Sequence, residues 1–526
     1  MSISKIIYIN LTEETVKYEE FNIKETMEYG RGLAAFLIIK NVSSSTDRYD
    51  GSNAIVLAPG LCSGTLVPST GRITIASKKS KSDGIQFADI AGPFSQKLAS
   101  LDIAAVVIIG KSNSENPITV VFSEGGTHIE KNMNLKEAVV SNTINEIRKK
   151  FGLEAAIIGI GPTGEHLLPL SSLFSTYPEG KVPEYHCTRG GMGDIFGSKG
   201  IKALVVKSKE HFNADVIYKE GISKNAKKLG KIIVSHPICG GALPGYGSIT
   251  LMKMLKQGKK IDLSKQSNIS KNIKKDSKLC NINKTCSPIC VIGCLNRHLK
   301  EGDNMYSSPA ESEVYAALKE AFDIDDKAFA STINKEAFEI GLDSVELVFS
   351  IALYYKAIEK NAKKEEIIGA LDEIKKLSVI GRLIGSKTQG IYSFYSDKTD
   401  LKPLVTKPSV NEEGKFSVLI KSKPEYLKHI SDLDYLYAMM TILGNFGICL
   451  FSAFALIENE DILYILSEVF FCKTGIKTEP SKIVKYSLNC MEREITFETN
   501  SKLGSVQKTI PEFVKVLYRY FDRSIK

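Results

Sequence analysis

The stretch TCSPICVIGC, at residues 285–294, carries three closely spaced thiols, Cys286, Cys290 and Cys294. A proline and a glycine inside this stretch indicate a loop rather than a regular helix, and a loop lets several sulfur atoms converge. A fourth cysteine, Cys449, ends the distant stretch GNFGIC. Three close thiols and one remote thiol are the arrangement that holds a four-iron cluster or a tetrahedral metal ion. The sequence therefore predicts a redox or metal protein.

The composition is that of an ordinary soluble globular protein. The chain has 526 residues and a net charge of +9, and this length suffices for about two to four domains. Ten irregularly spaced cysteines are too few for a disulfide scaffold of this size and fit a reducing compartment. The N-terminal apolar run is too short for a signal peptide and is typical of a first strand. We therefore expect a cytoplasmic protein.

One uncharged stretch, residues 435–457, is long enough to cross a bilayer. However, Gly444, Asn445 and Gly447 interrupt it, and Cys449 lies beside them. Polar and helix-breaking residues next to a predicted ligand favour a buried helix–loop–helix around a metal site. We therefore expect no membrane span.

Lysine residues crowd into residues 253–278, just ahead of the cysteine stretch. One interpretation is a solvated, mobile loop. The other is a docking patch for an acidic electron carrier, because opposite charges accelerate encounter. No aromatic residues alternate with these lysines, which disfavours a nucleic-acid partner.

The first two hundred residues are rich in short Val, Ile and Ala runs bounded by Gly, Pro or Ser, a pattern that predicts strands. Helical patterns at residues 32–41 and 135–151 interrupt these runs. Beyond about residue 210 the periodicity becomes helical, for example at residues 365–377. The pattern predicts an α+β fold with a β-rich N-terminal part followed by mainly helical segments.

Two glycine-bearing loops lie in the β-rich part, VPSTGRITIASK at residues 67–78 and TRGGMGDIFGSKG at residues 188–200. Closely spaced glycines let backbone N–H groups approach a phosphate or another anion, which Arg72 or Arg189 could clamp. Such loops are also common as simple tight turns, so the loops alone leave both interpretations open.

The order of these segments along the chain resembles the aldehyde:ferredoxin oxidoreductase family, from about residue 5 to residue 455. The elements that carry the resemblance follow in family order: GRGLAA at 30–35, PSTGR at 68–72, GP at 92–93, IGPTGE at 160–165, RGGMG at 189–193, FGSKGIKA at 196–203, PAESE at 309–313, IDD at 324–326, GLD at 341–343 and GIC at 447–449.

The resemblance implies a β-rich base domain (residues 1–208), a helical domain that carries the cysteine cluster (209–395) and a C-terminal helical domain that supplies the fourth cysteine (396–526). Members of the family bind a tungsten or molybdenum bis-pyranopterin beside a [4Fe-4S] cluster. They oxidise aldehydes to carboxylic acids and pass the electrons to ferredoxin. A homodimer is one expected oligomeric state.

The resemblance also assigns roles to particular residues. It gives the cluster to Cys286, Cys290, Cys294 and Cys449, and it makes Glu313 the residue that faces the metal and accepts a proton. The residues that it places against the pterins are Arg72, Arg189, Gly190 and Gly191 at the phosphates, with Gly341, Leu342 and Asp343 forming the turn from which Asp343 bonds a pterin.

Several positions depart from the family pattern. Cys286 and Cys290 have three intervening residues where the family has two, so Cys280 is a competing ligand. Tyr185 stands where the family has a phosphate-binding arginine, and Phe338 replaces an acidic residue ahead of GLD. No segment matches the family's catalytic-histidine stretch.

Three hypotheses remain open. The first is a divergent aldehyde:ferredoxin-type oxidoreductase with its pterin site. The second is a pterin-free relative that keeps the [4Fe-4S] cluster as an electron-transfer or scaffold protein. The third is a structural zinc site of four cysteines in a protein that is not an enzyme, which the cysteine spacing permits and the segment order disfavours.

Overall fold

The structure is a computed structural model of the full chain. It describes residues 4–23, 28–131, 134–178, 184–248, 250–251, 285–295, 297–299, 305–307, 310–401, 420, 422–501 and 517. The lysine-rich stretch at 253–278 and Cys280 therefore lie outside the described residues, and the predictions made for them are not tested.

The chain divides into two compact units, each assembled from separate segments. Unit 1 comprises residues 1–110, 208–296 and 408–526, and unit 2 comprises residues 111–207 and 297–407. The division into three domains, with a base domain over residues 1–208, stays a prediction.

Unit 1 contains a six-stranded sheet in the order β2-β1-β6-β3-β4-β5. Strand β1 pairs in parallel with β6 and antiparallel with β2, and β3, β4 and β5 continue the sheet in antiparallel fashion. The strands are β1 (Ser4–Asn10), β2 (Thr15–Phe21), β3 (Ile55–Pro59), β4 (Arg72–Lys78), β5 (Ile85–Ala91) and β6 (Ile103–Ile109).

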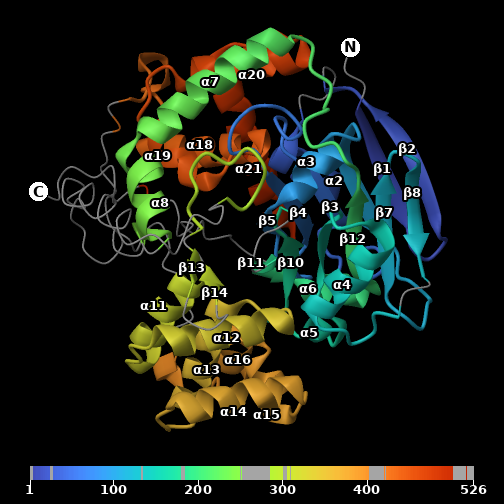
Figure 1. The fold of residues 1–526 in the computed structure, drawn as a ribbon, viewed down its shortest axis with the longest axis vertical. Helices are drawn as coiled ribbons and strands as arrows, with labels where there is room; N and C mark the ends of the chain where they lie inside the picture. The colour runs from blue at the N-terminus through green and yellow to red at the C-terminus, as the bar shows by residue number, and fades with distance from the viewer. Residues whose placement is uncertain are drawn as a thin grey trace, which may run out of the picture. The chain divides into compact units, whose positions relative to one another are not determined.

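Helix α2 (Gly30–Asn41) packs on this sheet through Leu33, Leu37 and Ile38, which share a buried cluster with Val56 and Val107. The remaining helices of unit 1 are α3 (Pro93–Ala99), α7 (Lys219–Ser235), η1 (Pro237–Ala242), α8 (Leu243–Tyr246), η3 (Glu425–Leu427), α18 (Asp432–Phe446), η4 (Leu450–Ser452), α19 (Ala453–Ile457), α20 (Ile462–Thr474) and α21 (Pro480–Ser501) (Figure 1).

The uncharged stretch at 435–457 forms the predicted helix–loop–helix. Helix α18 ends at Phe446, Gly447 adopts φ +76° as its left-handed cap, and η4 and α19 follow. Tyr435, Leu436 and Phe446 are fully buried in the large apolar cluster of unit 1. Among the helices of the described residues, none combines the length and the apolarity that a bilayer crossing requires.

Unit 2 contains a second six-stranded sheet in the order β11-β10-β9-β12-β7-β8. Its strands are β7 (Ile118–Ser123), β8 (Gly126–Glu130), β9 (Ala156–Ile160), β10 (Ser172–Thr176), β11 (Tyr185–Met192) and β12 (Ile201–Lys207). Three helices belong to the same part of the chain: α4 (Val140–Phe151), α5 (Pro162–Glu165) and α6 (Gly193–Ser198).

The second segment of unit 2 is helical apart from one short hairpin, β13 (Arg297–Leu299) and β14 (Met305–Ser307). Its helices are α11 (Ala310–Phe322), α12 (Lys327–Glu339), α13 (Ser344–Ala357), α14 (Lys364–Lys375), α15 (Val379–Ile384), α16 (Lys387–Phe394) and η2 (Thr399–Leu401). Two sheets within residues 4–207, followed by helices, confirm the predicted α+β fold.

Candidate metal centre and pterin-related turns

Ser69 joins the two cysteine stretches of unit 1. Its backbone N–H donates to the carbonyl of Ile289 at 3.0 Å, and its hydroxyl accepts from the N–H of Val291 at 3.3 Å. Its carbonyl accepts from the N–H of Cys449 at 2.8 Å. One residue of the PSTGR loop therefore holds the 285–294 loop and the end of the GNFGIC stretch together, although about 160 residues separate them in sequence.

The four predicted ligands lie around this junction. Cys294 is buried, and Cys286, Cys290 and Cys449 are partly buried. Cys286 shares a hydrogen bond with Cys290, and this bond, together with burial and the neighbouring Cys290, Cys294 and Cys449, raises the pKa of the Cys286 thiol well above its usual range. Burial, with Cys290 and Cys449 nearby, likewise raises the pKa of Cys294. The structure thus brings all four thiols into one poorly solvated region of unit 1.

Arg72, the first residue of β4, adds a positive charge to this region. Its Nη2 donates to Sγ of Cys449 at 3.7 Å. Burial tends to lower the pKa of Arg72, but Cys449, Asp89 and Cys286 outweigh that effect and raise it. Its Nε is buried and has no hydrogen-bond partner among the described residues. A cation placed beside thiol groups favours their thiolate form, which metal binding requires.

These residues fit an iron–sulfur cluster as a donor set: four thiols, one neighbouring cation and one buried donor with no partner among the described residues. Within the described residues, no group of three or more Cys, His, Asp or Glu side chains is close enough together to hold a metal ion. The assignment of the cluster to the four cysteines therefore stays a prediction.

A fifth thiol, Cys239, lies near the cluster residues, and the sequence predicts only an ordinary free thiol at this position. The buried Cys239 donates from Sγ to the carbonyl of Phe451 at 3.2 Å, and burial raises its pKa to about 12. Cys449 contributes to that shift. The preceding His236 caps η1 by accepting N–H bonds and pairs with Glu458 through Nε2 at 3.0 Å. No sequence signal pointed to this group, because the contacts with Phe451 and Glu458 are long-range.

The remaining predicted residues belong to unit 2, where Arg189 forms an ion pair with Glu313. Arg189 lies in β11 with its side chain 54% exposed, whereas that of Glu313, in α11, is 17% exposed. Gly190 and Gly191 follow Arg189 with φ values of +100° and +75°. The predicted anion-binding arginine and the predicted proton acceptor are therefore partners of each other.

The GLD turn is fixed by the IGPTGE motif and by Ser171, both in unit 2. Gly341 has φ +79°, and a Cβ there would lie 2.6 Å from the backbone nitrogen of Gly161 in the IGPTGE motif, so only glycine fits. Thr163 of the same motif donates from Oγ1 to the carbonyl of Ile340 at 2.6 Å. Leu342 is buried and forms an isolated antiparallel β-bridge with Ser171. Packing therefore explains why these two glycine motifs occur together.

Asp343 is the N-cap of α13. Its Oδ1 accepts from the backbone N–H groups of Val345 at 3.1 Å and Glu346 at 3.2 Å. This is the usual bonding of an aspartate at a helix start. The carboxylate that the sequence predicts to bond a pterin therefore already caps helix α13.

The two departures from the family pattern, Tyr185 and Phe338, belong to one buried cluster of unit 2. Tyr185 is 9% exposed and Phe338 is 6% exposed, and Phe174 packs edge-on against Tyr185 with ring centroids 6.3 Å apart. Burial and the nearby Glu339 raise the pKa of Tyr185 far above its usual range. Apolar packing therefore occupies two positions at which the family pattern has charged side chains.

Comparison with known proteins agrees with the order of motifs. Residues 6–208 match the family model described as the aldehyde ferredoxin oxidoreductase N-terminal domain. The chain is 26% identical over 377 residues to the tungsten-containing aldehyde ferredoxin oxidoreductase of Pyrococcus furiosus, covering 69% of this chain and 60% of the relative. The chain is 27% identical over 383 residues to the protein of the same name from Pyrococcus horikoshii, and the alignment covers 70% of this chain and 60% of that relative. The aligned region thus spans about 60% of the length of these relatives.

A weaker match is the WOR-like subunit of an aliphatic sulfonate oxidoreductase from Pyrococcus furiosus, 24% identical over 226 residues, which covers 39% of this chain and 34% of that one. Among solved structures, a chain of the active site complex BamBC of benzoyl coenzyme A reductase, in complex with 1,5-dienoyl-CoA, superposes with a TM-score of 0.73. It covers 97% of this chain and 92% of that chain at 16% identity, so this likeness concerns the fold.

The two sheets, the succeeding helices and the ordered motifs define an α+β relative of metal-dependent oxidoreductases. More particularly, residues 6–208 match the N-terminal domain of aldehyde ferredoxin oxidoreductases, and the chain is similar over 69–70% of its length to tungsten-containing aldehyde ferredoxin oxidoreductases.

Proposed function

We propose that this protein is an oxidoreductase of the aldehyde:ferredoxin type, which oxidises an aldehyde to a carboxylate and releases the electrons through a [4Fe-4S] cluster. The observation that supports the proposal is the junction at Ser69, which bonds to the loop of residues 285–294 and to Cys449, with Arg72 donating to Cys449. The similarity to tungsten-containing aldehyde ferredoxin oxidoreductases supports the reaction class.

The four thiolates would hold the cluster, which supplies one-electron transfer when it is bound. Arg72 has a separate task, because its charge offsets part of the negative charge that four thiolates bring into a buried region. Its Nη2 donates to Cys449, and such bonds to sulfur raise the reduction potential of a cluster. The chain's own residues thus favour acceptance of an electron at this position.

Oxidation of an aldehyde with one water molecule to a carboxylic acid releases two electrons and two protons. Glu313 is the proposed proton acceptor, and its pairing with Arg189 would hold the carboxylate in one orientation. Arg189, Gly190, Gly191 and the Gly341–Leu342–Asp343 turn would hold the phosphates and ring of a tungsten or molybdenum bis-pyranopterin. Ferredoxin or a similar acidic carrier is the proposed electron acceptor.

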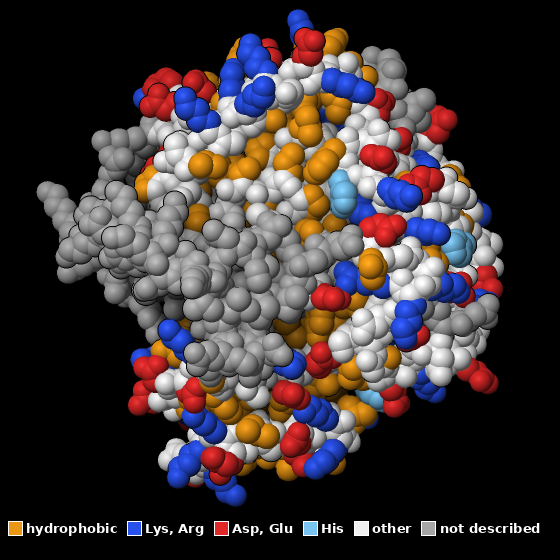
Figure 2. Space-filling model, in the orientation of Figure 1, with side chains coloured by type: hydrophobic (Ala, Val, Ile, Leu, Met, Phe, Trp, Pro, Cys, Tyr) orange, Lys and Arg blue, Asp and Glu red, His pale blue; other side chains and the backbone are white. Residues whose placement is uncertain are grey.

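A docking surface for such a carrier would be basic. On the face shown in Figure 2, the Lys and Arg side chains of the described residues alternate with Asp and Glu side chains, without a region of a single sign. The lysine-rich residues 253–278 remain the proposed docking patch.

A second candidate function is favoured by the buried cluster around Tyr185 and Phe338. Charged groups that would meet a pterin are replaced there by packed aromatic rings, and a pterin N–H left without an acceptor would be costly to bury. The four cysteines of the junction, by contrast, are all retained. The second candidate is therefore a relative without pterin that uses the cluster for electron transfer or as part of a scaffold.

The test is to prepare the full chain without oxygen, from a host that supplies tungstate, molybdate and the pterin. We expect iron, tungsten or molybdenum, oxidised-pterin fluorescence, and reduction of a viologen dye that depends on added aldehyde. Iron without tungsten, molybdenum or pterin would exclude the first function and support the second. Zinc without iron would exclude both.

A matched pair of variants tests the role of Glu313. Glu313→Gln should lose aldehyde-dependent dye reduction by at least about a hundredfold, as expected for a general base, while its iron and pterin contents stay unchanged. Glu320→Gln removes an exposed carboxylate from the same helix and should keep the activity. Full activity in Glu313→Gln would show that another group accepts the proton.

A further inference from the structure

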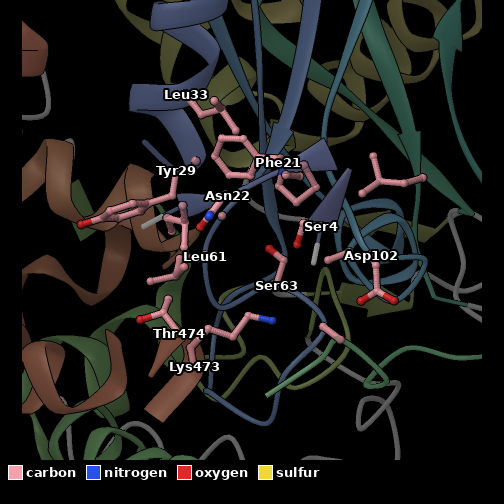
Figure 3. A pocket seen from close by; sticks show the side chains of 18 of the residues that line it. Ser4, Phe21, Asn22, Tyr29, Leu33, Leu61, Ser63, Asp102, Lys473 and Thr474 are labelled. Carbon is pink, nitrogen blue, oxygen red and sulfur yellow. The ribbon is translucent and has the colours of Figure 1, made fainter. Parts of the chain in front are cut away.

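A cavity of about 490 Å³ lies within unit 1, away from any residue assigned a role so far (Figure 3). Its volume is in the range of small-molecule sites, which are mostly apolar and contain a few placed polar groups. The apolar wall is contributed by Phe21, Leu33, Leu61, Ile103, Ile217 and Ile476. These residues come from β2, α2, β6 and the connecting segments, so the wall is assembled from several parts of the fold.

The polar groups of the cavity are few, and Lys473 is the foremost among them. It lies in the last turn of α20, and Figure 3 shows its amino group directed toward the middle of the cavity. The amino group donates to the carbonyl of Asp215. Within the described part of the chain, Lys473 forms no ion pair, so its ammonium group has two further N–H donors beside a cavity that both apolar and polar side chains line.

The surroundings of Lys473 make its charge costly without a partner. Burial lowers the pKa of Lys473, against the opposing influence of Cys62, Asp102 and Asp215. Asp102 also lines the cavity, but among the described residues it makes no ion pair with Lys473. An anion bound to Lys473 would replace the water contacts that the ammonium group loses on burial. An apolar group attached to that anion would contact the apolar wall of the cavity.

The cavity wall is held firmly on the side of Leu61. The N–H of Leu61 donates to the carbonyl of Asn445 at 2.9 Å, and the N–H of Cys62 donates to that of Phe446 at 3.2 Å. Tyr29, another lining residue, packs edge-on against Phe446 with ring centroids 5.6 Å apart. A preformed wall reduces the ordering that binding would require.

We propose that this cavity binds a small organic acid with an apolar body, whose carboxylate is held by the ammonium group of Lys473. The apolar body lies against Phe21, Leu33, Leu61 and Ile103. Asp102 disfavours the carboxylate by like-charge repulsion and sets an upper limit on the affinity. The site does not depend on the proposed redox function.

Hexanoate is the probe, and isothermal titration calorimetry on the full chain is the measurement. Hexanamide and hexylamine have the same apolar body with a neutral or a positive head. We expect hexanoate to bind and both analogues to bind at least about tenfold more weakly, as for a lost charge-assisted hydrogen bond. Equal binding of hexanamide, preferred binding of hexylamine, or no binding of hexanoate would overturn the proposal.

Two lysine variants locate the anchor. Lys473→Met keeps the length of the side chain without the charge and should weaken hexanoate binding by at least about tenfold. Lys482→Met is the matched control, because Lys482 is exposed and is not among the residues that line the cavity, and the affinity of this variant for hexanoate should stay within about twofold of that of the unmodified chain. Unchanged affinity in Lys473→Met would overturn the assignment, and circular dichroism verifies that each variant is folded.

Asp102→Asn provides a test that does not remove the anchor. It should tighten hexanoate binding, by roughly twofold to tenfold, since a repelling charge is lost. Weaker hexanoate binding in this variant would contradict the proposal. Norleucine, which adds an ammonium group to the same carbon chain, tests whether Asp102 is a second anchor. Tighter binding of norleucine than of hexanoate would overturn a site for simple carboxylic acids.

Discussion

The guanidinium group of Arg72 donates to Sγ of Cys449 across 3.7 Å, although 377 positions separate the two residues in sequence. Arg72 opens β4 of the sheet, and Cys449 follows the helix α18. Ser69 holds the third partner, the loop with Cys286, Cys290 and Cys294, against the same point. The start of one strand therefore connects the sheet to both cysteine stretches.

Replacing the remote cysteine should empty the proposed cluster site. In Cys449→Ser we expect the iron content and the broad visible absorbance of anaerobically prepared protein to fall to a small fraction of the original. A hydroxyl is a poor substitute for a thiolate at iron. Cys472→Ser, which changes a buried thiol of α20, should keep both signals. Full colour and full iron in Cys449→Ser would show that Cys449 is not a ligand.

Removing the positive charge of Arg72 should make the cluster harder to reduce. Reduction adds negative charge, which Arg72 stabilises by its charge and by its bond to Cys449. In Arg72→Met we expect the reduction potential to fall by at least about 60 mV, the shift for a tenfold change in a one-electron equilibrium. Arg72→Lys keeps the positive charge, so its reduction potential should fall by less. A redox titration followed by electron paramagnetic resonance measures this, and an unchanged potential in Arg72→Met would contradict it.

The close approach of two glycines should make Gly60 intolerant of any side chain. A Cβ on Gly60 would lie 2.1 Å from the Cα of Gly447, which is backbone and cannot move aside easily. We expect Gly60→Ala to lower the free energy of unfolding by roughly 3 kcal/mol. In Gly230→Ala the new Cβ would meet only Pro68 at 3.9 Å, and helix propensity should raise stability by up to about 1 kcal/mol. Urea denaturation compares the two, and equal stabilities would refute the packing argument.

Asp343 should affect stability through its cap and activity through its charge, and two variants separate these. Asp343→Ala removes the acceptor for Val345 and Glu346 and should cost about 1 kcal/mol of stability. Asp343→Asn keeps a capping oxygen and should leave stability within about 0.5 kcal/mol. If Asp343 also bonds a pterin, both variants should lose pterin. If both variants retained pterin at full occupancy, the role of Asp343 would be restricted to capping α13.

His211 should make unit 1 less stable in mild acid. Burial, with Lys97 nearby, lowers the pKa of His211 to about 4 in the folded chain, against about 6.5 when unfolded. The unfolded state therefore binds more protons between these values, so this contribution is present above pH 6.5 and is lost as the pH falls toward 4. After allowance for partial exposure the loss is roughly 1 to 2 kcal/mol.

The comparison is between the unmodified chain and His211→Gln, with urea denaturation at several pH values from about 4 to about 7. The variant should lose less stability on acidification than the unmodified chain over that window. The same dependence of the free energy of unfolding on pH in both proteins would mean that His211 does not titrate with a lowered pKa.

The amino-acid sequence sufficed to predict several features because they depend on local spacing. Short Val, Ile and Ala runs bounded by Gly, Pro or Ser predicted strands, and the structure has strands such as β3 and β6 there. Gly444, Asn445 and Gly447 inside an uncharged stretch predicted a helix–loop–helix, which α18, η4 and α19 form. Cysteine spacing predicted which four thiols act as ligands, and this assignment stays a prediction, although the four thiols influence one another's pKa in unit 1.

Other features depend on contacts between distant segments, which spacing does not encode. Nothing local marks Ser69 as the joint between two cysteine stretches, since a serine in a loop is common. Arg189 and Glu313, interpreted separately as an anion clamp and a proton acceptor, pair with each other. Asp343 could be recognised as a cap only once α13 was seen to begin at Ser344.

By itself the sequence determined the α+β class and the resemblance to aldehyde ferredoxin oxidoreductases, and it predicted a set of candidate ligands, because residue type and order along the chain carry that information. Tertiary structure alone decided that Tyr185 and Phe338 share one apolar cluster and that Lys473 faces a cavity with no ion-pair partner among the described residues. The physical reason is that burial and charge pairing are set by which surfaces meet when the chain folds, and those surfaces come from segments hundreds of residues apart.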